Sequence, residues 1–361
     1  VKNGDVIKNF ESPAPGELLS CNDENATKGM NSYIITAYNE SGAGKRVEVS
    51  AFVGNDTPSA PLNITASGNE DGTLKLSWTA PEKGKNGGYI NKSQLSYSAY
   101  TVDDEGYADL YEENIKGNSV SLAELDNTGE QRFEFFGVQA VNKDGESDIM
   151  PSNSVIMGDA YTLPFADSFA NGELAYGIWY SERTGANGFA LNDMTSADND
   201  GGCISFQAAE AKAIASFCSG KIALNGSNSP VLTFDYYCNP GSEDILLAEI
   251  NRAYIDTTVV KTINFTQETG VAGWRHVVVS LQQFKSAPYI QLVFLSQIAK
   301  ADNAVMIDNI KIENNPELSV NDIMVDAAKD KNVYDIVGRR QKSTGLHNGI
   351  YIKEGKKIVV K

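Results

Sequence analysis

A pattern of five residues occurs twice in this chain, 103 positions apart. The first copy consists of Tyr33, Ile35, Ala37, Asn39 and Gly42, and the second of Phe136, Val138, Ala140, Asn142 and Gly145. In each copy apolar and polar positions alternate with a period of two and then reach an Asn and a Gly, as in a half-buried strand that enters a turn. A repeat of this length corresponds to one β-sandwich domain rather than to a solenoid unit.

The composition favours β-structure. The 361 residues are enough for two or three domains. Thirty-two Gly and sixteen Tyr accompany many short apolar alternations that are bounded by turn residues. We therefore expect an all-β protein of several domains. No apolar run approaches the roughly 18 residues of a membrane-spanning helix.

The charge distribution separates one end of the chain from the rest. The formal net charge is −17, which argues against a nucleic-acid partner, because phosphate affinity comes mainly from clustered Lys and Arg. Residues 329–361 nevertheless carry nine Lys or Arg against three Asp or Glu. This basic end is expected to be a separate unit.

The second copy of the repeat lies in a segment that resembles a fibronectin type III domain. Pro58 and Pro61 precede an alternating strand that ends at Trp78, and the segment 140–145 reads Ala-x-Asn-x-x-Gly. The resemblance implies such a domain over residues 58–159. Subtraction of the repeat length places the start of the first copy's domain before Val1, so residues 1–57 are expected to be the C-terminal part of a truncated fibronectin type III domain.

A different pattern occupies residues 160–315, where loops are rich in Asp, Asn and Gly. Its characteristic segments are 163–169 followed by Trp179, 198–202, 229–236, 274–281 and 307–310. Their order resembles the cleaved-adhesin and MAM-like jelly-roll family of surface proteins in Bacteroidetes-type bacteria. The resemblance implies a jelly-roll β-sandwich.

The C-terminal residues 316–361 form a fourth segment. The runs 333–340, 348–352 and 356–361 predict three short strands with Gly turns. The segment resembles the C-terminal sorting domain of the type IX secretion system, in which a Tyr-Asp-x-x-Gly-Arg strand precedes a Gly-x-Tyr strand. The alternative is a solvated basic hairpin.

Four acids are candidate calcium ligands. Calcium takes six to eight oxygen ligands, so a site needs acids that converge from different loops. Related jelly rolls hold a structural calcium with acids of the first strand, an Asp-rich loop and the last strand, and the resemblance assigns these roles to Asp167, Asp198, Asp200 and Asp308. The alternative for the Asp-x-Asp-Gly segment is an ordinary turn.

The sequence gives little support for catalysis. It contains only two histidines, His276 and His347, and it lacks the G-x-S-x-G and H-E-x-x-H motifs. No pair of acids stands out as a glycosidase pair. Cys203 and Cys218 could form a disulfide or remain buried thiols. No catalytic residue is therefore assigned.

Aromatic residues in the jelly-roll segment are candidate contacts for a ligand. Jelly-roll modules often stack sugars on exposed aromatic rings, and Tyr180, Tyr237 and Tyr254 are the positions whose faces the pattern leaves open. Trp179 and Trp274 have apolar neighbours and are expected in the core.

Together these features predict a non-catalytic adhesin-like protein, secreted or attached to the outer-membrane surface. It is expected to be a monomer that binds a host protein or a glycan through a calcium-stabilised jelly roll. The alternative is an accessory region of a secreted protease or glycoside hydrolase whose catalytic domain lies upstream.

Overall fold

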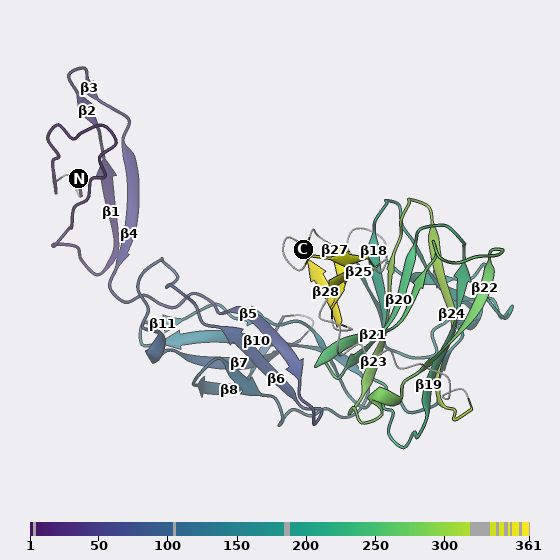
Figure 1. The fold of residues 1–361 in the computed structure, drawn as a ribbon. Coiled ribbons are helices and arrows are strands. Elements are labelled where there is room, and N and C mark those ends of the chain that lie inside the picture. Colours follow the sequence, from purple (N-terminus) through teal and green to yellow (C-terminus); the bar gives the residue numbers. More distant parts are fainter. Residues whose placement is uncertain are drawn as a thin grey trace. The chain divides into compact units, whose positions relative to one another are not determined.

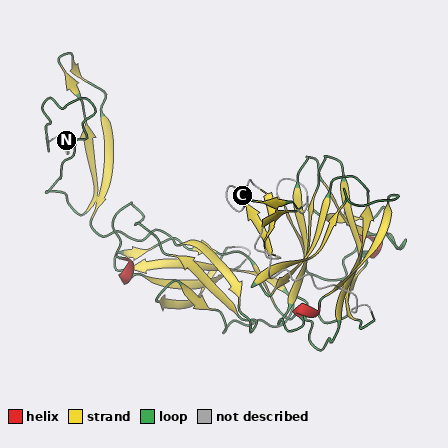
Figure 2. Cartoon of the chain, in the orientation of Figure 1, coloured by secondary structure: helices red, strands yellow, loops and turns green. Residues whose placement is uncertain are grey.

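The computed structural model describes residues 1–2, 5–103, 106–183, 188–317, 333–336, 339–342, 346, 349–353 and 356–360. These residues form β-strands joined by loops, with three short 3-10 turns: η1 (Lys92–Gln94), η2 (Ala170–Gly172) and η3 (Gln282–Phe284) (Figure 2). This confirms the expected all-β class. No helix in the described ranges is long and apolar enough to cross a membrane.

The chain divides into two compact units. One consists of residues 1–66, 75–122 and 134–154, and the other of residues 67–74, 123–133 and 155–361. The domain boundaries expected after residues 57, 159 and 315 remain predictions. Gly338 and Asn348 of the expected tail motif, and also His347, lie outside the described residues.

The N-terminal region is built on a two-stranded ladder. Strands β1 (Gly29–Ile35) and β4 (Val47–Val53) pair antiparallel over their whole lengths, and β2 (Tyr38–Asn39) pairs with β3 (Gly42–Ala43). Apolar side chains on this ladder, such as Met30 and Ile35, are more than half exposed. The ladder therefore has an apolar surface that the described residues leave open.

The sequence repeat corresponds to a repeated hairpin. Asn39 lies opposite Gly42, and Asn142 lies opposite Gly145. Both glycines have positive φ angles, 119° and 142°, a region that favours Gly. In both copies the Asn side-chain oxygen accepts a bond from the backbone N–H two residues further on, at 2.9 and 2.8 Å. The two copies share one local structure.

The first sandwich has two sheets. One has the order β5-β6-β9, and the other has the order β11-β10-β7-β8 with β12 also paired to β10. The strands are β5 (Leu62–Gly68), β6 (Leu74–Thr79), β7 (Ser96–Val102), β8 (Ala108–Ile115), β9 (Ser119–Ser121), β10 (Arg132–Asn142), β11 (Gly145–Glu146) and β12 (Met150–Pro151), and β13 (Val155–Met157) follows. Leu76 and Trp78 are buried, and the Trp78 ring lies 5.1 Å from that of Tyr97 on β7. The period-two pattern of β6 is confirmed.

The jelly roll also has two sheets (Figure 1). The first sheet contains, in order, β16 (Ala190–Asn192), β17 (Cys203–Gln207), β24 (Ala304–Asn314), β19 (Pro230–Cys238) and β22 (Gly273–Ser280), with β14 (Phe165–Asp167) on β24. The second contains β15 (Trp179–Arg183), β18 (Ile214–Ser219), β23 (Ile290–Gln297), β20 (Ile245–Arg252) and β21 (Asp256–Asn264). Strands β28 (Lys356–Val360), β27 (Gly349–Lys353), β25 (Val333–Asp335) and β26 (Arg340–Gln341) continue the second sheet.

The core lies between these two sheets. Phe234 on β19 and Phe294 on β23 make an edge-to-face contact at 4.9 Å, and Trp179 stacks on Phe217 at 4.6 Å. Each fully buried side chain of this kind contributes about 1.5–3 kcal/mol. The prediction that Trp179 belongs to the core is confirmed.

The cysteines are free thiols. Cys203, Cys218 and Cys238 are buried and Cys21 is exposed. Burial raises the pKa of Cys203 and of Cys218 to about 12. Of the two alternatives for Cys203 and Cys218, the structure contains the buried thiols.

Candidate cation site and outer-face cluster

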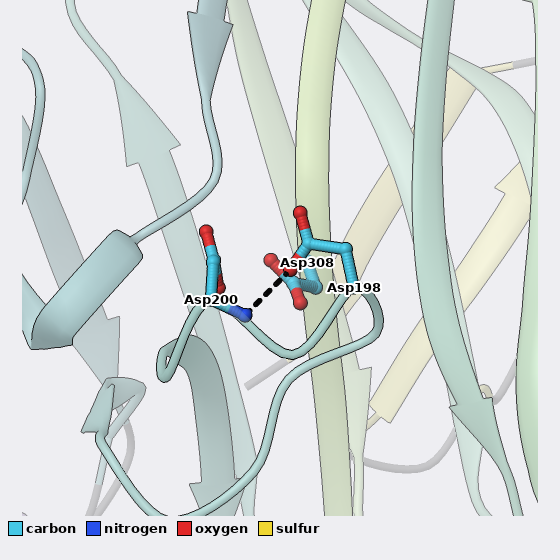
Figure 3. A group of neighbouring side chains, drawn as sticks. All are labelled: Asp198, Asp200 and Asp308. Atoms are coloured by element: carbon cyan, nitrogen blue, oxygen red, sulfur yellow. Dashed lines mark hydrogen bonds between the residues drawn. The ribbon is translucent and has the colours of Figure 1, made fainter.

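Three of the four acids selected from the sequence lie together in the jelly roll (Figure 3). Asp198 and Asp200 belong to the loop between β16 and β17, and Asp308 lies on β24. One carboxylate oxygen from each residue can be chosen so that all three lie within 4.8 Å of one another. A loop and a strand more than a hundred residues apart in the sequence thus converge on one point.

One hydrogen bond holds this loop against β24, and another lies within the loop. Ala197 donates its N–H to Asp308 Oδ2 at 2.6 Å, and Asp200 donates its N–H to Asp198 Oδ1 at 3.1 Å. Gly202 passes so close to Phe169 that a Cβ at this position would overlap the Phe169 carbonyl. The loop position therefore depends on a residue without a side chain.

The electrostatics of the three acids fit a cation. Asp308 is fully buried, and this burial, with the nearby Asp198 and Asp200, raises its pKa to about 6. Asp200 Oδ1 is buried and finds no hydrogen-bond donor in the described part of the chain. A buried carboxylate oxygen without a donor is costly unless a cation or a proton compensates it. Hard cations such as calcium favour all-oxygen sites of this kind.

Asp167 lies outside this group. Its carboxylate accepts three N–H bonds, from Phe169 N at 3.0 Å, from Ala175 N at 2.9 Å and from Trp179 Nε1 at 2.9 Å. On β14 it stands opposite Ile310 of β24. Asp167 thus anchors the segment that follows β14 and orients the buried Trp179.

The three candidate tyrosines have different environments. Tyr180 makes an edge-to-face contact with Phe133 at 5.2 Å, and burial raises the pKa of its hydroxyl. The Tyr254 hydroxyl accepts the backbone N–H of Ile156 at 2.8 Å. Both side chains are therefore engaged in internal contacts. Only Tyr237 lies on the outer side of the first sheet.

A second aromatic ring accompanies Tyr237. Tyr237 on β19 lies directly opposite Trp274 on β22, and the rings meet edge to face at 5.6 Å. The two residues that flank Tyr237, Tyr236 and Cys238, belong to the core. Because successive side chains of a strand point to opposite faces, Tyr237 and Trp274 lie on the outer face. The prediction that Trp274 is a core residue is wrong.

Polar side chains continue this face. His276 lies opposite Asp235, and its Nδ1 is 2.8 Å from Asp235 Oδ1. Asn309 donates its side-chain N–H to Asp235 Oδ2 at 3.0 Å. We call Tyr237, Trp274, Asp235, His276 and Asn309 the outer-face cluster.

The outer-face cluster adjoins the cation site. Asp235 is opposite Asp308 in the pairing of β19 with β24, and Asn309 directly follows Asp308. The backbone N–H of Asn309 also binds Asp308 Oδ1 at 2.7 Å. Sequence reasoning missed Asp235, His276 and Asn309 as a group. The usable signal was the matched alternation of 229–236 and 274–281, which is typical of two paired strands.

No protein-family model matches this sequence, and no curated protein matches it. Similar solved structures include the K1 cleaved adhesin domain of Lys-gingipain from Porphyromonas gingivalis W83, with 16% identity, a TM-score of 0.34, and coverage of 42% of this chain and 98% of that chain. A family 11 carbohydrate-binding module from Clostridium thermocellum, in complex with a β-1,3-1,4-mixed-linked tetrasaccharide, has 12% identity, a TM-score of 0.31, and coverage of 41% and 93%.

Proposed function

We propose that this chain is a non-catalytic, adhesin-like binding protein whose jelly roll binds a carbohydrate on the outer-face cluster. The observation that carries the proposal is the pair of Tyr237 and Trp274, which lies half-buried on a sheet face outside the core. Aromatic rings in such positions are frequent anchors of binding sites, since they bring a large apolar surface at low entropic cost.

The polar members of the cluster suit the hydroxyl groups of a sugar. Asp235 offers carboxylate acceptors, Asn309 offers both a donor and an acceptor, and His276 has a second ring nitrogen. The hydrogen bonds among these three side chains fix their orientations before a ligand arrives. A few oriented polar groups beside an apolar surface are the usual composition of a small-ligand site.

We propose calcium as the cation of Asp198, Asp200 and Asp308. Three carboxylates supply part of a calcium shell, and backbone carbonyls and water complete such shells in proteins. The cation would offset the mutual repulsion of the three acids and hold the 193–202 loop beside Asn309. Its role would be structural, with no part in a reaction.

A glycan array tests the proposed ligand class. The labelled full chain, in calcium-containing buffer, should bind a restricted set of glycans, and excess unlabelled chain should compete. A glycan-free array of extracellular host proteins is run in parallel. If the chain bound proteins of that array and no glycan, the carbohydrate proposal would be wrong and the ligand would be a protein.

We also propose that the protein is exported to the cell surface and that residues 316–361 direct the export. The support is the strand order of the segment, with Tyr334 and Asp335 on β25 and Tyr351 on β27. Deletion of residues 316–361 in the producing bacterium, followed by cell fractionation, tests this. Continued surface display of the shortened chain would contradict it.

A further inference from the structure

Part of the outer face of the second jelly-roll sheet is apolar. On β20, Leu246, Ala248 and Ile250 belong to the core between the sheets. The alternate residues Ile245 and Leu247 point away from the core and are nevertheless buried. Residues of the C-terminal segment cover them.

This cover is a small apolar cluster. Ile336 and Ile350 are buried against Ile245, Leu247 and Leu295. The partly buried residues packed on the same cluster are Ile214, Val259 and Ile352. We call the face formed by Ile214, Ile245, Leu247, Glu249, Val259 and Leu295 the tail-docking face.

One ion pair lies in this contact. Glu249 on β20 has an exposure of 0%, and Lys357 Nζ of β28 lies 2.9 Å from its Oε2. Neither Glu249 oxygen accepts a well-directed hydrogen bond from the described residues. The positive charge of the Lys357 ammonium therefore stabilises the buried Glu249 carboxylate. Burial raises the pKa of Glu249, and Lys357 opposes that rise.

The strand pairing between the C-terminal segment and the jelly roll is short in the described part of the chain. There β28 pairs with β21 at Thr258 and Lys356, whereas β27 and β28 pair with each other from Gly349↔Val360 to Lys353↔Lys356. Among the described residues of the segment, none belongs to the core between the two sheets. The core of the jelly roll is thus made by its own strands, and the segment has strand pairing of its own.

From these contacts we propose that the tail-docking face is a receptor for a basic β-segment, occupied reversibly by strands β25, β27 and β28 of the same chain. The apolar cluster supplies the attraction, and Glu249 selects a segment with a lysine at the position of Lys357. An acidic residue there would place two carboxylates together in a buried contact. Dissociation of the segment exposes the face and leaves the jelly-roll core intact.

A peptide competition experiment tests the receptor. A fluorescent peptide of residues 331–361 is titrated into the full-length wild-type chain and into full-length Lys357→Met, with anisotropy as the readout. In the wild-type chain the C-terminal segment occupies the face, and the apparent affinity for the peptide is reduced in proportion to the fraction of chains whose face is free. Lys357→Met weakens the docked segment and raises that fraction, so this variant should bind the peptide at least about tenfold more tightly. Full-length Lys353→Met, which removes the same charge from β27, should behave like wild type. Equal affinity of Lys357→Met and wild type for the peptide would overturn the proposal.

Hydrogen exchange of the unmodified full chain gives a second test that requires no variant. Reversible docking predicts that the amides of residues 349–353 exchange through a local opening, with lower protection than the amides of β23 at the centre of the sheet. Equal opening free energies for β27 and β23 would show that the segment is an integral part of one cooperative fold, which overturns the proposal.

Discussion

Asp308 is a buried carboxyl group that faces two further acids. Its two oxygens accept backbone N–H bonds from Ala197 and Asn309, which are favourable to the ionised form. Burial and the negative charges of Asp198 and Asp200 outweigh these bonds and raise its pKa to about 6. At neutral pH the site therefore holds a charge that a proton or a cation would stabilise.

Thermal unfolding against pH tests this residue. Without a cation, the native state binds more protons than the unfolded state between the ordinary Asp pKa of 3.8 and about 6, so the unfolding free energy should fall as pH rises through that window. Calcium at about 100 times its Kd should raise the unfolding free energy by about 2.7 kcal/mol at pH 7.5 and have little effect on it at pH 4.5. Asp308→Asn should abolish both effects, and equal midpoints of wild type in EDTA and in calcium at pH 7.5 would contradict the cation proposal.

Strand β22 illustrates what the sequence can and cannot predict about an element. The alternation of residues 274–281 predicts the strand, and it puts Trp274 and His276 on one face with Val277 on the other. It does not say which face meets the second sheet. That choice depends on partners such as Tyr237, more than thirty residues away, and sequence reasoning chose wrongly for Trp274.

The loop between β16 and β17 has its own test in Gly202→Ala. The new Cβ would overlap the Phe169 carbonyl, so the backbone that carries Asp198 and Asp200 must shift. We expect the free energy of unfolding to fall by about 1–3 kcal/mol and the calcium affinity to fall at least about tenfold. Gly201→Ala is not a clean control, because Gly201 has a φ of 88°. Gly177→Ala is better, since a Cβ at Gly177 meets no atom within 4 Å. Unchanged calcium affinity in Gly202→Ala, measured by calorimetry, would show that this loop does not form part of the calcium site.

The contact between β20 and β28 predicts a strong coupling between two side chains. Removal of one partner of a buried ion pair costs about 3–5 kcal/mol, whereas replacement of both by apolar residues is often neutral. Lys357→Met should therefore loosen the C-terminal segment, and Glu249→Leu with Lys357→Met should restore its protection from hydrogen exchange. Additive effects of the two substitutions would show that the charges act independently.

At the scale of the whole molecule, the repeat and the strand alternations were enough to predict an all-β chain of several domains. The four candidate calcium ligands came instead from the resemblance of residues 160–315 to a known family, and the structure brings three of them together, Asp198, Asp200 and Asp308. The docked C-terminal segment was not predictable. Its contacts join Glu249 to Lys357, more than a hundred residues apart, and in sequence Glu249 is one acid among forty-seven Asp and Glu.

The most direct test of the binding role is calorimetric titration of the full chain with the glycan that the array selects. Trp274→Ala should lower the affinity at least about tenfold, as expected for loss of an aromatic anchor. Its unfolding midpoint should stay close to that of wild type, because Trp274 lies outside the core. Tyr89→Ala, which removes an aromatic ring that is 64% exposed outside the jelly roll, should bind like wild type. Unchanged glycan affinity in both Trp274→Ala and Tyr237→Ala would contradict a binding site on this face.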